Sequence, residues 1–240
     1  GYTRRQGVEG APALGWIELI SVSDAGAGLR VNVRTPQGEA VLETTLVGDF
    51  NVENLMAALG VLLALDVPLE RACEALQTVE APPGRMERVT DSTGRGPRVV
   101  VDYAHTPDAL RAALDALRDE AGSSTPDADL WCVFGCGGDR DPGKRVEMGR
   151  MARTRAAHVV VTSDNPRGEP PMAIIEDILA AWPRDAVPPL IEADRARAIR
   201  LAVSSANPAQ TVLLAGKGHE RYQILADRTI DFDDRVVARE

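Results

Sequence analysis

The sequence has few cysteines, no excess of positive charge and no long apolar run. Only three of its 240 residues are cysteines, and they have no C-x-x-C spacing, which is typical of a reducing compartment and gives little support for a metal site. We expect Cys73, Cys132 and Cys136 to be buried thiols in apolar surroundings. The longest apolar run, residues 55–65, has about half of the ~20 residues that a membrane-spanning helix needs.

Other absences exclude further classes of function. The chain carries 27 Lys and Arg against 36 Asp and Glu, a net charge of −9, so no positive surface field would attract nucleic acid. A G-x-G-x-x-G pattern with a downstream acidic residue is missing, which argues against a dehydrogenase, and nothing resembles a Ser/His/Asp triad. No signal peptide is visible, and we therefore expect a cytoplasmic protein with neither a membrane nor a nucleic-acid partner.

Short runs of β-forming residues, separated by turns, occupy the first 46 residues, at 15–20, 29–33 and 41–46. They predict a β-meander. Residues 51–65 are apolar on nearly every face, which predicts a helix buried on all sides, and residues 69–76 have the spacing of an amphipathic helix.

The segment DSTGRGP, residues 91–97, has the composition of a linker, so we expect two domains, 1–93 and 94–240. In the second domain, four apolar runs each end in a polar or glycine-rich turn that is followed by a helix signal. The runs are residues 99–101, 130–134, 159–161 and 212–214. Thr106 and Asp194 are expected to cap two of the helices.

This alternation predicts an α/β fold with a Rossmann-like, mainly parallel sheet covered by helices on both sides. In such sheets, ligands bind beyond the carboxyl ends of the strands. All four polar turns follow strands, and we therefore expect them to converge on one crevice.

The turn FGCGGDRDPGKR, residues 134–145, contains the P-loop pattern G-x-x-x-x-G-K. However, Arg145 stands where that motif needs Ser or Thr, Pro142 removes a backbone donor, and Asp139 and Asp141 put negative charge where an anion would lie. We do not expect this loop to bind phosphate.

The same loop offers the planar guanidinium of Arg140, which suits a carboxylate. The alternative is that Arg140 pairs with the neighbouring aspartates on the surface and binds nothing. In SDNPR, Pro166 limits where Asn165 and Arg167 can point, which reduces the entropy lost on binding and favours a site for a small polar ligand. The alternative is that these residues form a simple turn.

The segment AGKGHE follows the last long apolar strand. Glu220 can hold an ammonium group, and the backbone at Gly216 permits close approach. His105 and His219 remain open between an acid–base role and a structural one, whereas His158 is expected to be structural. Two arginines, a glutamate and an asparagine amide together fit a zwitterion with an additional carboxylate, which describes an amino acid.

Six ordered motifs together resemble the second half of a Mur ligase. They are GDFNVENLMAALG, GRME, VVVDYAHTPDAL, FGCGGDRDPGKR, TSDNPRGEPP and AGKGHERYQ. The resemblance runs from about residue 48 to the C-terminus and is closest to the members that add meso-diaminopimelate to UDP-N-acetylmuramoyl-L-alanyl-D-glutamate in peptidoglycan synthesis. It implies that residues 1–93 are the remainder of a central ATPase domain, and that residues 94–240 are a C-terminal amino-acid-binding domain.

The resemblance also implies which residues contact ligands. Those expected to contact ATP are Asn54, Arg85 and Asp102, of which Asp102 accepts hydrogen bonds from the ribose. Those expected to contact meso-diaminopimelate are Arg140, Asp164, Asn165, Pro166, Arg167, Gly216 and Glu220. The resemblance implies ATP and Mg²⁺ as cofactors, but it implies no catalytic residue and no metal ligand within these 240 residues.

The implied reaction starts with ATP phosphorylating the D-glutamate side chain, because a carboxylate is a poor electrophile. The amine of diaminopimelate then attacks the acyl phosphate and expels phosphate. Lysine lacks the distal carboxylate and would leave Arg167 desolvated and unpaired, so we expect it to be rejected.

The family's P-loop, Mg²⁺ ligands, modified lysine and UDP-sugar domain are expected to precede Gly1. We therefore predict that these residues alone catalyse no ligation, although they can hold diaminopimelate weakly. Two alternatives stay open. One is another Mur or folylpolyglutamate-type ligase, against which Arg167 argues, and the other is a stand-alone, non-catalytic module that binds an amino acid or a nucleotide.

Overall fold

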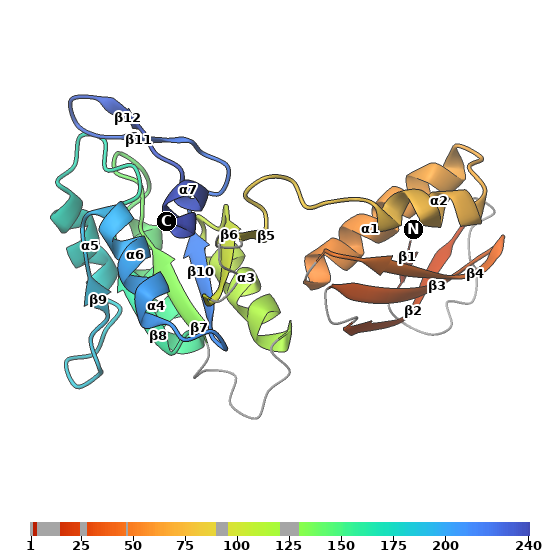
Figure 1. The fold of residues 1–240 in the computed structure, drawn as a ribbon, viewed down its shortest axis with the longest axis horizontal. Coiled ribbons are helices and arrows are strands. Elements are labelled where there is room, and N and C mark those ends of the chain that lie inside the picture. Colours follow the sequence, from red (N-terminus) through yellow and green to blue (C-terminus); the bar gives the residue numbers. More distant parts are fainter. Residues whose placement is uncertain (1, 4–14, 25–27, 47, 90–95, 121–129) are drawn as a thin grey trace. The chain divides into compact units, whose positions relative to one another are not determined.

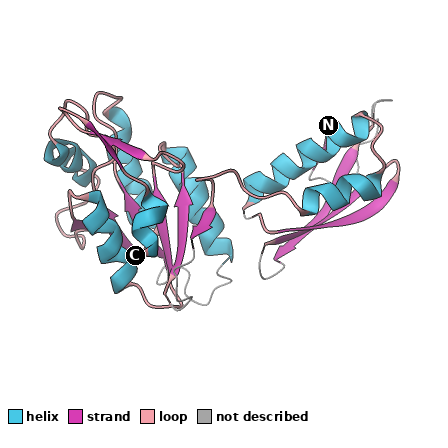
Figure 2. Cartoon of the chain, turned by 45° about the horizontal axis from the view of Figure 1, so that its top comes forward, coloured by secondary structure: helices cyan, strands magenta, loops and turns pink. Residues whose placement is uncertain are grey.

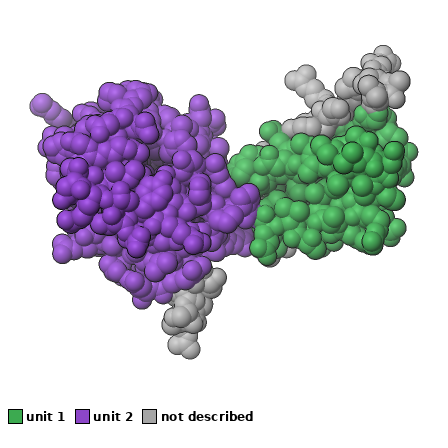
Figure 3. Space-filling model, turned by 90° about the horizontal axis from the view of Figure 1, so that it is seen from above, with its two compact units in different colours: residues 1–80 green, residues 81–240 purple. Residues whose placement is uncertain are grey.

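The chain divides after Glu80 into two compact units, Gly1–Glu80 and Ala81–Glu240, which Figure 3 colours separately. The computed structural model describes residues 2–3, 15–24, 28–46, 48–89, 96–120 and 130–240. The division comes earlier than the expected boundary after residue 93, because strand β5 (Glu87–Val89) pairs with β6 (Arg98–Asp102) of the second unit. Most of the expected linker, residues 91–97, lies outside the described residues.

The first unit contains a sheet with the strand order β1-β2-β3-β4. The bounds of its strands are β1 Tyr2–Thr3, β2 Ile17–Asp24, β3 Leu29–Thr35 and β4 Gly38–Thr44. Strands β2 to β4 pair antiparallel in sequence order, which confirms the predicted meander. Alternate residues such as Val31, Val33 and Leu42 are fully buried because successive side chains of a strand point to opposite faces.

Two helices, α1 (Asp49–Ala64) and α2 (Leu69–Gln77), complete this unit (Figure 1). The amphipathic α2 buries its predicted face. The prediction that the first helix is buried on all sides is wrong, since Val61 is 59% exposed and the residue after the helix, Leu65, is 70% exposed. An apolar helix covers only the face that finds neighbours in the fold, and here α1 packs against α2 and β2.

The second unit contains a six-stranded sheet with the order β5-β6-β10-β7-β8-β9. Figure 1 labels these strands, and Figure 2 draws strands in magenta and helices in cyan. Its further strands are β7 Leu130–Phe134, β8 His158–Val161, β9 Leu190–Ile191 and β10 Thr211–Ala215. Only β5 is antiparallel to its neighbour. The predicted mainly parallel sheet is therefore confirmed, and all four predicted apolar runs are strands in it.

Helices cover both faces of this sheet. They are α3 Pro107–Glu120, α4 Gly143–Arg155, α5 Pro171–Leu179, α6 Arg195–Ser205 and α7 Asp234–Arg239. Helix α4 packs between α3 and α5, whereas α6 packs with α7. Both predicted caps form, because Thr106 accepts from the Ala109 N–H at 3.3 Å and Asp194 accepts from the Arg197 N–H at 3.0 Å. A short hairpin, β11 (Tyr222–Ile224) and β12 (Thr229–Asp231), precedes α7.

The core explains why the strands read as continuous apolar runs. Val101 and Val133 pack in one cluster with Ile199 of α6, while Val100 and Cys132, which alternate with them, are equally buried on the opposite face. Within the described ranges, no helix combines the length and the apolarity that crossing a membrane would require.

All three cysteines are buried and unpaired by disulfides, as predicted. Burial raises the pKa of Cys132 and of Cys136 to about 12, and it raises the pKa of Cys73 as well. Because the thiolate is the reactive form, the native protein should alkylate with iodoacetamide at pH 8 far more slowly than a free thiol. Mass spectrometry should find all three sites labelled only after denaturation. Native labelling at the rate of a model thiol would contradict this burial.

A fully buried ion pair joins α6 to α7. Arg195 donates to Asp234 through Nε at 2.8 Å and through Nη2 at 2.6 Å, and neither side chain has any exposed area. The guanidinium also donates to the carbonyl of Ser163 at 3.4 Å and to that of Ala215 at 3.1 Å. The pair therefore holds the ends of β8 and β10 against the last helix.

Replacing Asp234 by Asn should lower the free energy of unfolding by about 3–5 kcal/mol, since it leaves the Arg195 charge buried without a counter-charge. Urea denaturation followed by circular dichroism measures the change. The control is the same substitution at the exposed Asp227, which should change stability by less than about 0.5 kcal/mol. Equal effects in the two variants would refute the role of the buried pair.

Candidate functional site

The four polar turns of the second unit meet at one edge of the sheet. Strands β6, β10, β7 and β8 are parallel neighbours, so their carboxyl ends lie side by side. The Gly216 N–H donates to the carbonyl of Asp102 at 3.0 Å, and the Gly138 N–H donates to the carbonyl of Asn165 at 2.9 Å. Direct backbone bonds thus connect turns that are far apart in the sequence.

Glycines permit this close approach. A Cβ atom on Gly135 would lie 2.3 Å from the Thr162 carbonyl oxygen, and one on Gly138 would lie 1.9 Å from the Pro166 carbonyl oxygen. Neither position has room for a side chain. The glycines of the turn after β7 therefore allow this turn to pack directly against the turn after β8.

Backbone N–H groups of the P-loop-like turn already donate to carboxylates of the protein itself. The Asp139 N–H donates to Glu169 at 2.6 Å, and the Gly143 N–H donates to Asp141 at 2.9 Å. Pro142, which precedes α4, has no N–H to donate. This arrangement leaves no series of free backbone donors for a phosphate group.

Arg145, which replaces the Ser or Thr of a P-loop, has a structural role that the sequence did not reveal. Its side chain is 3% exposed, and its Nη1 and Nη2 atoms donate to both Glu169 oxygens at 2.9 and 2.8 Å. Nη1 also donates to Asp177 at 2.9 Å. This guanidinium holds the pKa of Glu169 below its ordinary value and joins α4 to α5.

Arg140 and Arg167 come together at Gly137, where a Cβ atom would lie 2.9 Å from Arg167 Nη1 and 3.6 Å from Arg140 Cγ. Arg167 Nη1 donates to the carbonyl of Gly138 at 3.0 Å and to that of Asn165 at 3.3 Å. Arg140 is exposed and has no ion pair or hydrogen bond within the described ranges, so the alternative in which it pairs with its neighbouring aspartates is not what the structure shows.

Asn165 and Glu220 also meet, at 2.9 Å between Asn165 Nδ2 and Glu220 Oε2. Lys217 joins them, since its Nζ atom lies 3.1 Å from Asn165 Oδ1 and 3.0 Å from Glu220 Oε2. Asn165 Oδ1 accepts a further bond from the Ile224 N–H at 2.9 Å. Most of the Asn165 amide is therefore used within the protein, which leaves one N–H for a ligand instead of the whole group.

Asp164, Pro166 and Gly216 are buried in the same region. Gly216 has a positive φ of 114°, and a Cβ atom there would lie 2.7 Å from Asp164 Oδ2. Burial raises the pKa of Asp164, while the nearby positive charges of Arg195 and Lys217 oppose that rise. The structure thus brings together all seven residues expected to contact the amino acid.

The residues expected to contact ATP are divided between the units. Asp102 is buried and accepts from the Met86 N–H at 2.8 Å, and burial raises its pKa. Arg85 lies over the ring of Tyr103, with its Cζ atom 4.9 Å from the ring centroid. Asn54 belongs to the first unit, where its amide donates to Asn51 at 3.2 Å.

The histidines have aromatic neighbours. His158 stacks on Trp131 at 4.2 Å between ring centroids, as expected of a structural residue. The exposed rings of His105 and His219 lie 4.5 and 5.3 Å from that of Tyr103. His105 also bonds the Tyr103 carbonyl through Nδ1 at 2.9 Å, which is a structural contact.

Gln223 is a further residue that sequence reasoning missed. Its Nε2 atom donates to the carbonyl of Asp164 at 2.6 Å and to Ser163 Oγ at 3.0 Å. The available signal was the alternation in β11, where an inward-facing polar residue lies between exposed or half-buried neighbours. Gln223 attaches the hairpin to the turn that carries Asn165.

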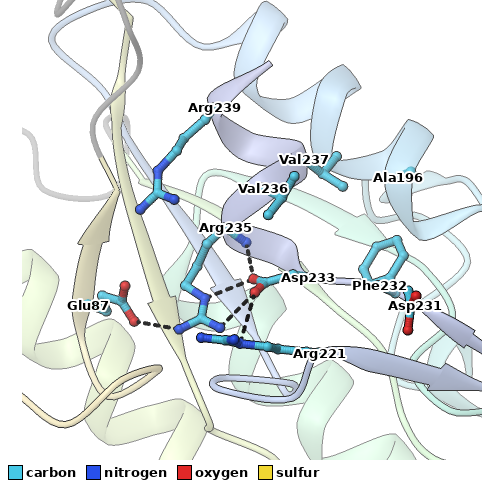
Figure 4. Close-up of a pocket in the computed structure, with 10 residues that line it drawn as sticks. All are labelled: Glu87, Ala196, Arg221, Asp231, Phe232, Asp233, Arg235, Val236, Val237 and Arg239. Atoms are coloured by element: carbon cyan, nitrogen blue, oxygen red, sulfur yellow. Dashed lines mark hydrogen bonds and ion pairs between the residues drawn. The ribbon is translucent and has the colours of Figure 1, made fainter.

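A surface pocket of about 770 Å³ lies beside α7 and contains none of the predicted site residues (Figure 4). Arg235 bridges it, donating to Asp233 at 2.7 Å and to Glu87 at 3.3 Å. Glu87 also accepts from the Gly84 N–H at 2.7 Å. The positive and negative charges in these contacts offset each other, and the contacts attach α7 to the turn that carries Arg85.

Two comparisons of sequence find the same kind of protein. Residues 84–218 match the family model described as Mur ligase, glutamate ligase domain. The chain is 50% identical over 213 residues to the UDP-N-acetylmuramoyl-L-alanyl-D-glutamate--2,6-diaminopimelate ligase of Gloeobacter violaceus, covering 89% of this chain and 42% of that protein. The ligase of the same name from Coxiella burnetii is 46% identical over 220 residues, covering 91% of this chain and 43% of the relative.

Solved structures agree. One of a UDP-N-acetylmuramoyl-L-alanyl-D-glutamate--2,6-diaminopimelate ligase superposes with a TM-score of 0.67 and 38% identity over 93% of this chain and 44% of that one. The folylpolyglutamate synthase of Mycobacterium tuberculosis, at 21% identity and a TM-score of 0.65 over 83% of this chain and 45% of that one, shares the fold alone. This chain spans less than half the length of these proteins.

A substitution at Gly135 tests the contact between the turns after β7 and β8. Gly135→Ala should lower stability by about 1–3 kcal/mol, because the added methyl group forces the turns after β7 and β8 apart. The control is Gly15→Ala, whose Cβ atom would have no neighbour within 4 Å among the described residues and which should change stability by less than about 0.5 kcal/mol. Thermal unfolding of both variants measures the difference. Similar melting temperatures would contradict the proposed contact.

Proposed function

Because this chain belongs to the Mur ligase family, we propose that it is the part of an ATP-dependent amide ligase that binds meso-diaminopimelate for addition to UDP-N-acetylmuramoyl-L-alanyl-D-glutamate. One observation carries the proposal, namely that Arg140 and Arg167 meet at Gly137 while Asn165 connects Arg167 to Glu220. Two cationic groups and one anionic group at one edge of the sheet complement an amino acid that has an additional carboxylate.

The hydrogen-bonding atoms of these side chains that have no partner within the protein suit the carboxylate and ammonium groups of diaminopimelate. Arg140 has its whole guanidinium available, and Arg167 uses only Nη1 for backbone carbonyls, so both can donate to a carboxylate. Glu220 Oε1 has no partner within the described ranges and can accept from an ammonium group. The names of the relatives at 46–50% identity support diaminopimelate over the substrates of other amide ligases.

The reaction class follows from the chemistry of amide formation. ATP supplies the phosphoryl group that converts the D-glutamate side-chain carboxylate into an acyl phosphate. An amine of diaminopimelate then forms the C–N bond, the C–O bond to phosphate breaks, and the amine loses a proton. Within this chain, the strand-end turns hold the amino acid and orient its amine, which raises the rate by removing translational and rotational freedom.

The residues of the second unit are compatible with part of an ATP site. Asp102 accepts a hydrogen bond from the Met86 N–H, and a carboxylate has further acceptor sites for ribose hydroxyls. Arg85 and Asn54 are the other two residues proposed to contact the nucleotide. The described part of the chain has no group of three or more His, Cys, Asp or Glu residues that could by itself hold a metal ion. We assign no step to the metal, and we place the reaction in the cytoplasm.

Calorimetry with meso-diaminopimelate and lysine tests the proposal. The chain should bind diaminopimelate and discriminate against lysine by up to about 10⁴-fold, because lysine leaves a guanidinium desolvated and unpaired. Arg167→Met should weaken diaminopimelate binding and reduce the discrimination. Arg150→Met, in an exposed pair on α4, is the matched control and should change neither. Absent or equal binding of the two ligands by the folded chain would overturn the proposal.

A further inference from the structure

Lys217 lies in a Gly-Lys-Gly sequence that suggests a phosphate-binding lysine, yet its side chain points inward. It has no exposed area and is among the largest fully buried side chains of the described chain. Its Nζ atom donates to Asn165 Oδ1 and to Glu220 Oε2, and it lies 5.5 Å from the centroid of the Tyr222 ring. An ammonium group has three protons, and two hydrogen bonds and one cation–π contact account for all of them. None is left for a phosphate group.

The three side chains form a closed triangle, because Asn165 Nδ2 also donates to Glu220 Oε2. Asn165 Oδ1 accepts hydrogen bonds from Lys217 and from the Ile224 N–H. These two bonds fix which end of the amide faces which partner. The carboxylate of Glu220 receives two donors on Oε2, so its Oε1 atom is turned away from the triangle.

The positive charge of Lys217 is also favourable at this position. The carboxyl groups of Asp164 and Glu220 repel each other, and the side chain of Glu220 is only 16% exposed. The ammonium group of Lys217 lies 3.0 Å from Glu220 Oε2 and places a positive charge beside both carboxyl groups.

We infer that Lys217 is a positioning residue, which holds the Glu220 carboxylate and the Asn165 amide in the orientation that receives the amino group of the substrate. The inference rests on the proposed function, since it needs an amino-acid ligand at this edge of the sheet. Lys217 itself touches no substrate. Its effect should therefore be confined to the part of the affinity that comes from the ammonium group of the ligand.

The test compares meso-diaminopimelate with pimelate, a dicarboxylate of the same length without amino groups, by calorimetry. In the wild-type chain, diaminopimelate should bind more tightly. Lys217→Met should reduce that preference by about 10- to 100-fold, the size of effect seen when outer-shell partners of metal ligands are removed. Glu220→Gln should reduce it similarly. The double variant should lose little more, because the two residues act through one contact.

The chain contains one other lysine, which provides a matched control. Lys144 is half-buried and donates to the carbonyl of His105 at 2.9 Å, and Lys144→Met should leave the preference unchanged. A structural defect alone would weaken both ligands equally. If Lys217→Met keeps the wild-type preference, the inference is wrong and the proposed function stands. If the folded wild-type chain binds neither ligand, the proposed function fails and the inference fails with it.

A second measurement needs no variant and applies even if Lys217→Met does not fold. Reductive methylation of the native chain, followed by peptide mass spectrometry, should modify Lys144 and leave Lys217 unmodified. Addition of saturating meso-diaminopimelate should keep Lys217 protected. Modification of Lys217 at the rate of Lys144 would overturn the inward position on which the inference depends.

Discussion

Direct backbone contact between the turns at the carboxyl edge of the parallel sheet is the constraint on which the proposed site depends. Parallel strands bring their ends to one edge, but side chains would normally keep the following turns apart. Gly135 and Gly138 remove that obstacle, because any Cβ atom there would overlap the backbone that follows β8. At Gly216, whose φ is positive, a Cβ atom would lie 2.7 Å from a side-chain oxygen of Asp164. The turns therefore pack as one layer, which brings their charged side chains together at one edge of the sheet.

The cationic residues of this layer fall into two groups. Arg145, Arg195 and Lys217 are almost completely buried, and each has a carboxylate partner. The carboxylates of Arg145 and Arg195 come from other segments, whereas that of Lys217 is Glu220 of the same turn. Burying a charge is costly unless it is paired and hydrogen-bonded, so these three have little capacity for a ligand. Arg140 and Arg167 lie closer to the surface and keep free donors. The buried cations hold the framework, and the other two are the arginines that we propose to recognise the ligand.

Much of the fold was predictable because its signals are local. Four apolar runs followed by turns and helix caps indicated a mainly parallel sheet, and the N-caps Thr106 and Asp194 formed as expected. The first helix shows the limit of such reasoning, since its apolar residues lie on every face and only the fold decides which of them are covered. The early boundary has the same origin, because β5 is a three-residue strand that exists through its pairing with β6.

The sequence by itself determined which chemical groups stand at the ends of the strands, since the Asp-Asn-Pro-Arg and Gly-Lys-Gly-His-Glu segments follow apolar runs directly. Only the tertiary structure decided which of those groups remain free. The Lys217 ammonium group donates a hydrogen bond to Asn165, 52 residues away in the chain, and the Arg145 guanidinium group donates to Glu169, 24 residues away. The availability of a charged side chain depends on its burial and on its nearest opposite charge. Burial is set by the whole fold, and the partners Glu169 of Arg145 and Asn165 of Lys217 come from segments distant in sequence, which no local pattern reports.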